Sequence, residues 1–256
     1  MAQFLHGEKY FSMKKSSQSL IRRCKLSVAK QRMLFALFCA GATARASARA
    51  AGVNRNTAAR IFRVFRLLIA LSRLSLVPFS GRVEIDECYI FGAPGGRKVA
   101  RQGRCLAGKF AVAGVAQRCP ETGVRRLKTA VLPAVNRETL HAFAREYVAP
   151  GSEVNTDQFR AYDLTRCGFV HKRVNHSLVF KNFKTGACTN IIESAWSVLR
   201  RHFSRFCGGY RHNLRLWLAE VEMRFECGVN GFEKSLKKLL KNTCVPVSVW
   251  KNCLRL

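Results

Sequence analysis

The hydrophobic pattern of the chain changes at residues 74–81, LSLVPFSG, and this change constrains the fold more than any other feature. Before it, apolar residues recur three and four positions apart, as in helices. After it, runs of β-branched and aromatic residues are typical of strands. Pro78, Ser80 and Gly81 interrupt both patterns and mark a boundary. The predicted divisions are a basic arm (1–28), an all-α domain (29–77), an α/β domain (78–228) and a C-terminal tail of unclear structure (229–256).

The all-α domain contains a predicted helix-turn-helix. A first helix is expected over residues 29–41. Thr43 can cap a short Ala-rich helix, which Gly52 ends with a tight turn, and Asn54 or Thr57 can cap the next helix. The outward positions of that last helix carry donors suited to phosphates and base edges: Arg55, Asn56, Arg60 and Arg63. A helical hairpin with solvated arginines is the alternative interpretation.

The charge of the chain favours a polyanionic partner. Lys and Arg number 45 against 15 Asp and Glu, so the formal net charge is +30. Such a charge opposes compaction unless a polyanion neutralises it. Nucleic acid is the leading candidate, and an anionic membrane surface is the alternative. No stretch approaches the roughly 18 apolar residues of a membrane span, and eleven cysteines without a Cys-x-x-Cys spacing indicate free thiols in a reducing cytoplasm.

The part after residue 81 has the pattern of a mixed α/β domain. Strands are expected over residues 82–91, 109–118, 123–132, 151–157 and 169–176, and helices over 136–148, 190–206 and 213–226.

Three carboxylates occur where this pattern can bring them to one edge of a sheet. Asp86 lies inside the first strand and shares a face with Glu84, while Glu87 points to the other face. Asp157 ends a second strand, and Glu193 lies in the first turn of a helix. Hard oxygen ligands of this kind suit Mg²⁺ or Mn²⁺, and two such ions can promote phosphodiester cleavage.

Each carboxylate also has a simpler interpretation. Asn190 and Glu193 are three residues apart and resemble a capping box, so Glu193 could serve only the helix. Asp157 could be a turn residue, and Glu84 and Glu87 could be surface charges.

Five segments in this order resemble bacterial insertion-sequence transposases with an ISXO2-like DDE domain. They are VEIDECYIFG, GKFAVAGVAQR, VNTDQFRAY, HKRVNHS and TNIIESAWSVLRR. The resemblance covers about residues 40 to 226. It implies an RNase H-like mixed sheet with flanking helices, preceded by the all-α helix-turn-helix domain. Many relatives begin with a Cys-rich zinc ribbon, so this chain is expected to be a short form without one.

Carried over position by position, the resemblance makes Asp86, Asp157 and Glu193 the catalytic carboxylates and the ligands of Mg²⁺ or Mn²⁺. Asn190 matches an Asn that accompanies the Glu in the family, and which of the two dominates as third ligand stays open. Arg200, seven residues after Glu193 on the same helix face, matches a basic position near the DNA.

The resemblance therefore implies a cytoplasmic DNA transposase. It would bind the terminal inverted repeats of its own insertion sequence as a homo-oligomer on double-stranded DNA, with no membrane partner. It would hydrolyse the 3′ ends and join them to target DNA. The alternatives are an RNase H-like nuclease or resolvase without strand transfer, and a DNA-binding protein with a decayed catalytic domain.

Overall fold

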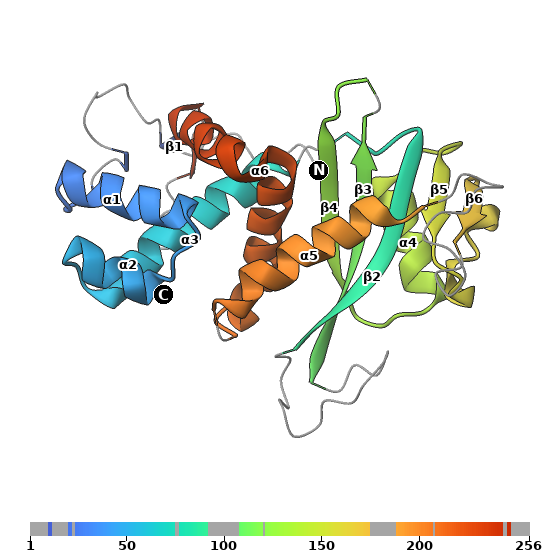
Figure 1. The fold of residues 1–256 in the computed structure, drawn as a ribbon, viewed down its shortest axis with the longest axis horizontal. Helices are drawn as coiled ribbons and strands as arrows, with labels where there is room; N and C mark the ends of the chain where they lie inside the picture. Colours follow the sequence, from blue (N-terminus) through green and yellow to red (C-terminus); the bar gives the residue numbers. More distant parts are fainter. Residues whose placement is uncertain are drawn as a thin grey trace. The chain divides into compact units, whose positions relative to one another are not determined.

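The computed structural model describes residues 10–11, 20–21, 24–74, 77–91, 108–119, 121–174, 188–206, 208–242 and 245–246 (Figure 1). The chain divides into two compact units. One unit combines Met1–Ser75 with Cys227–Leu256, and the other is Leu76–Glu226. None of the helices in the described part of the chain is long and apolar enough to cross a membrane.

The first unit contains the predicted helix-turn-helix. Its helices are α1 (Val28–Cys39), α2 (Ala44–Ala51) and α3 (Arg55–Ser72). The Thr43 side chain caps α2, and Gly52 ends it in the left-handed region, with φ 57°. Asn54, rather than Thr57, caps α3, since its side chain accepts a hydrogen bond from the backbone N–H of Asn56 at 2.8 Å. These local devices were all visible in the sequence.

The C-terminal part of the chain completes this unit. Helix α6 (Leu214–Asn242) is interrupted at Gly228, which has φ 64° and ψ −174°. Beyond this break, Phe232, Leu236 and Leu240 are buried. The ring centroid of Phe232 lies 6.1 Å from that of Phe38 in α1. Residues 229–242, which the sequence pattern left without structure, are therefore a helix of the N-terminal unit.

Short strands from the two ends of the chain also meet in this unit. β1 (Tyr10–Phe11), which falls in the predicted basic arm, pairs antiparallel with β7 (Val245–Pro246).

The second unit is built on a five-stranded mixed sheet. Its strands are β2 (Arg82–Phe91), β3 (Lys109–Arg118), β4 (Arg125–Leu132), β5 (Glu153–Thr156) and β6 (Val170–Arg173), in the order β4-β3-β2-β5-β6. β2, β3 and β4 are antiparallel, whereas β5 is parallel to β2 and β6 is parallel to β5. With helices against the sheet and helices before it, this confirms the predicted fold class.

Helices cover the two faces of this sheet. α4 (Arg137–Tyr147) packs Leu140 and Phe143 against one face, where Val83 and Ile85 of β2 are buried. α5 (Asn190–Ser204) packs against the other face, which carries Cys88 (Figure 1). The alternation along β2 therefore places Glu84 and Asp86 on the α5 face.

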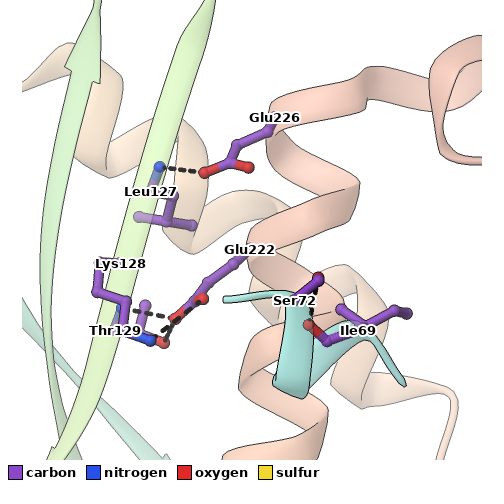
Figure 2. A network of polar contacts seen from close by, with 7 residues as sticks. All are labelled: Ile69, Ser72, Leu127, Lys128, Thr129, Glu222 and Glu226. Carbon is purple, nitrogen blue, oxygen red and sulfur yellow. Dashed lines mark hydrogen bonds and ion pairs between the residues drawn. The ribbon is translucent and has the colours of Figure 1, made fainter. Parts of the chain in front are cut away.

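The outer edge of β4 is closed by side chains of α6 (Figure 2). Glu222 accepts hydrogen bonds from the backbone N–H and the hydroxyl of Thr129, at 2.7 and 2.6 Å. Glu226 accepts from the backbone N–H of Leu127 at 2.9 Å. Four residues of helix and two residues of strand each advance about 6–7 Å, so acids four apart match outward N–H groups two apart. The edge that would otherwise offer these donors to another chain is thereby occupied.

Candidate active site

Asp86 and Asp157 are placed side by side by the pairing of two parallel strands. β2 and β5 pair with Val83 opposite Val154 and Glu84 opposite Asn155. Continuing this register by two residues places Asp157, which directly follows β5, opposite Asp86. The sequence predicted that these two carboxylates would meet, and the strand register provides the reason.

The electrostatics of Asp86 show the proximity of other acids. The pKa of Asp86 is raised to about 7, mainly by burial and also by the negative charges of Glu87 and Asp157, whereas the hydrogen bond from Trp196 lowers it. Two neighbouring carboxylates that both ionise repel each other, and a cation between them relieves the repulsion. The donor set therefore fits a hard divalent ion.

Asp157 also shapes the turn after β5. Its Oδ1 accepts a hydrogen bond from the backbone N–H of Phe159 at 2.9 Å. The simpler interpretation of Asp157 as a turn residue is thus correct as far as it goes. The same side chain lies close enough to Asp86 for its negative charge to raise the pKa of Asp86.

Glu84 is not a surface charge, because only 2 % of it is exposed. Its Oε2 accepts from the backbone N–H groups of Ile191 and Ile192, at 2.7 and 3.0 Å. Its Oε1 accepts from the thiol of Cys188 at 3.2 Å. Unpaired N–H groups at the start of a helix attract a carboxylate. Glu84 therefore fastens the beginning of α5 to the middle of the sheet.

Glu87 is buried on the opposite face, as the alternation predicted. It accepts a hydrogen bond of 2.6 Å from the hydroxyl of Tyr162, so it too is no surface charge.

From its anchor at Glu84, α5 runs along β2. One turn later, the indole N–H of Trp196 donates to Asp86 Oδ2 at 2.9 Å. A further turn along, Arg200 lies close enough to Cys88 to oppose the rise in the pKa of that thiol, which burial mainly causes. The helix and the strand keep step because four helical residues and two strand residues advance by similar lengths. The Arg200 side chain is exposed.

Glu193 is exposed in the first turn of α5, and its Oε1 accepts from the hydroxyl of Thr189 at 2.9 Å. The capping-box alternative is wrong, because the helix cap is Thr189 and Asn190 is the first helical residue. Asn190 is exposed beside Glu193. Among the residues that the structure describes, no group of three or more His, Cys, Asp and Glu side chains is placed to hold a metal ion. The structure thus joins Asp86 to Asp157 and leaves Glu193 held by Thr189.

The predicted DNA-contacting side chains lie on α3. Arg55, Asn56 and Arg60 are exposed in its first two turns. Arg63 differs, since it is half-buried and its Nε is buried without a hydrogen-bond partner among the described residues.

Sequence reasoning missed three contributors to the carboxylate site. Nothing in the sequence separates Trp196 from the other apolar residues of its helix, and Gly114 received no role although a glycine inside a strand often marks a close approach. Asn155, opposite Glu84, is fully buried, and its side-chain amide has no hydrogen-bond partner in the described part of the chain. No local pattern distinguishes such an Asn from an exposed one.

Residues 78–226 match the family described as "ISXO2-like transposase domain". Proteins with such DDE transposase domains typically use divalent metal ions. A protein of Haemophilus influenzae described as "Uncharacterized transposase-like protein" is 37% identical over 125 residues, which are 47% of this chain and 98% of that protein.

Two solved structures of the Mos1 transposase were also compared with the chain. The Mos1 strand transfer complex matches with a TM-score of 0.30 and 12% identity, over 88% of this chain and 77% of that one. The Mos1 paired-end complex matches with a TM-score of 0.20 and 13% identity, over 77% and 78%. The family match spans more than half of the chain and includes β2, β5 and α5, and the chain therefore belongs to the ISXO2-like transposase domain family.

Proposed function

We propose that this DDE transposase binds the terminal inverted repeats of its own insertion sequence and catalyses metal-dependent 3′-end cleavage and strand transfer. The observation that carries the proposal is the pair Asp86 and Asp157, held at one level on adjacent parallel strands within the transposase domain. A buried acid whose pKa is raised by burial and by neighbouring carboxylates, as that of Asp86 is, is often functional.

The carboxylates have distinct tasks in this proposal. Asp86 and Asp157 hold Mg²⁺ or Mn²⁺ from the sheet, and Glu193 joins them by exchanging its hydrogen bond with Thr189 for the ion. Asn190, beside Glu193, assists it. Divalent ions held by these residues would supply activation of the attacking oxygen and charge stabilisation of the leaving oxygen of the phosphodiester.

Basic side chains hold the DNA against this negative site. Arg200 is exposed on α5 close to β2, where it can contact a phosphate. A charge of +30 attracts the polyanion over longer distances.

The first turns of α3 read the terminal repeats. Arg55, Asn56 and Arg60 project from the second helix of a helix-turn-helix, the element that enters the major groove in such motifs. Arg63 is half-buried and supports this surface from its edge.

We expect Arg60→Ala to lose about 1–3 kcal/mol of discrimination between repeat and random DNA. Arg45→Ala is the matched control, because Arg45 is an exposed arginine of α2 and should weaken binding to both DNAs alike. Equal binding of both DNAs by the parent protein would contradict this role.

Glu193 provides the sharpest test of the catalytic proposal. With Mg²⁺ and DNA that carries the terminal repeats, Glu193→Gln should fold and bind DNA at least as tightly as the parent. Its cleavage and strand transfer should fall by orders of magnitude, because a charged ligand becomes neutral. Glu138→Gln is the matched control, since Glu138 is an exposed acid in the first turn of α4.

Two outcomes would overturn parts of this proposal. Cleavage by Glu193→Gln at the parental rate would remove Glu193 from the metal site. Cleavage by the parent without joining would identify a nuclease of the same fold.

A further inference from the structure

Asp86 lies opposite a glycine that has a specific packing role. In the antiparallel pairing of β2 and β3, Asp86 is the direct partner of Gly114. A Cβ added to Gly114 would lie 2.5 Å from Cη2 of Trp196 and 2.9 Å from Cδ1 of Ile192. Real Cβ atoms do not approach other atoms so closely. The indole ring of Trp196 therefore occupies the space that any other residue at position 114 would fill.

This packing determines where the indole N–H points. Trp196 is only 2 % exposed and belongs to the hydrophobic cluster that also contains Val112, Ala116 and Leu199. With its ring held over Gly114, Trp196 donates to Oδ2 of Asp86 at 2.9 Å. Indole nitrogen only donates, so this bond leaves no ambiguity about its direction.

A fixed donor on one oxygen of Asp86 has a consequence for the orientation of its carboxylate. Asp86 is an aspartate with a short side chain, and the bond to Trp196 restricts its rotation. The carboxylate of Asp86 therefore keeps a constant orientation relative to Asp157 on the adjacent strand. Groups that hydrogen-bond to metal-ligating carboxylates orient them, and their loss typically lowers metal affinity or activity about 10–100-fold.

We propose that Trp196 is the positioning residue of Asp86, and that Gly114 is present because it accommodates the indole ring. This inference rests on the proposed function, in which Asp86 binds a divalent ion.

The test compares two tryptophans of the same hydrophobic cluster. Trp196→Phe removes the N–H and keeps an aromatic ring, and Trp217→Phe makes the same change in α6. Binding of Mn²⁺ to the full-length protein is measured by calorimetry, and the Mn²⁺ concentration for half-maximal DNA cleavage is measured separately. Trp196→Phe should weaken Mn²⁺ binding about 10–100-fold and raise the half-maximal concentration by a similar factor. Trp217→Phe should change neither, and equal Mn²⁺ affinity in the parent and Trp196→Phe would overturn the inference.

Two further variants separate the possible failures. Replacement of Trp196 by β-(3-benzothienyl)alanine preserves the ring size and removes only the N–H, so it decides the question even where Trp196→Phe folds poorly. Asp86→Asn tests the underlying function. If Asp86→Asn abolishes Mn²⁺ binding and cleavage while both Trp196 variants behave like the parent, only the positioning inference fails. If Asp86→Asn also behaves like the parent, the proposed metal site itself is wrong.

Discussion

Buried carboxylates in two regions of the second unit, Leu76–Glu226, have opposite surroundings. At the outer edge of the sheet, Glu222 is 1 % exposed, accepts two hydrogen bonds from Thr129 and lies 4.0 Å from the ammonium of Lys128 (Figure 2). At the centre, Asp86 receives the indole N–H of Trp196 but lies near two other acids, Glu87 and Asp157. The first arrangement stabilises the fold, and the second opposes it.

The comparison shows that burial alone does not mark a functional acid. Glu84 and Asp86 are two residues apart on one face of one strand, yet Glu84 resembles Glu222, because backbone N–H groups satisfy it. Donors stabilise the charged form of a buried acid, and at Glu84 they oppose the rise in pKa that burial causes. A buried acid that faces other acids costs stability, and its retention is explained by a ligand that the folded chain must hold.

The largest expected difference between the two regions is in catalysis. Asp157→Asn should lower cleavage by orders of magnitude, because it removes a charged ligand while Asn can still accept the turn hydrogen bond from Phe159. Glu222→Gln keeps the acceptor for Thr129, so its cleavage rate per folded molecule should equal that of the parent. Both are measured with Mg²⁺ and repeat DNA. Equal losses of cleavage in Asp157→Asn and Glu222→Gln would show that the two regions do not differ in function.

Glu84 connects the two kinds of acid, and its removal should affect both stability and cleavage. Glu84→Ala leaves the N–H groups of Ile191 and Ile192 without their acceptor, which should cost about 2–3 kcal/mol in the free energy of unfolding. The loosened start of α5 should also lower cleavage, since Glu193 lies in its first turn. Urea unfolding and cleavage assays measure the two effects. Glu84→Gln, which keeps an acceptor, should lose less of both; a Gln variant as impaired as the Ala variant would show that the charge itself is required.

Glu222 should affect stability alone. Glu222→Ala leaves the N–H of Thr129 unpaired at the sheet edge and should cost about 1–3 kcal/mol. Urea unfolding measures this loss, and cleavage for each folded molecule should not change. A stable Glu222→Ala protein would mean that water replaces the carboxylate at this edge.

A further effect is on the pH dependence of stability without metal. The pKa of Asp86 is about 7 in the fold against 3.8 as the ordinary value. Between these values the unfolded chain has released a proton that the folded chain still holds, so stability falls as pH rises and levels off above about pH 7. Asp86→Asn removes this loss. In chelator, it should raise the melting temperature more at pH 8 than at pH 5, by about 2–4 °C for each kcal/mol regained. An equal shift at both pH values would show that Asp86 does not titrate in this range.

Much of the fold could be predicted because it depends on neighbouring residues. The side chains of Thr43 and Asn54 cap helices, and the backbone N–H of Gly52 ends one, through hydrogen bonds to residues two to four positions away. Alternation along one strand assigned Glu84 and Asp86 to one face and Glu87 to the other. Secondary structure, the helix-turn-helix and the identity of the candidate carboxylates are therefore determined locally.

Only the tertiary structure decided which partner each acid meets. The register that places Asp157 beside Asp86 joins strands separated by β3, β4 and α4. The donors that satisfy Glu84 come from residues more than a hundred positions away, as does the indole that orients Asp86. Phe232 likewise reaches the core of the N-terminal unit from the opposite end of the chain. A residue's own neighbours determine its backbone conformation and its face. Whether a buried charge is stabilised or destabilised depends on the donors and charges that packing brings near it. These groups have no fixed spacing in the sequence.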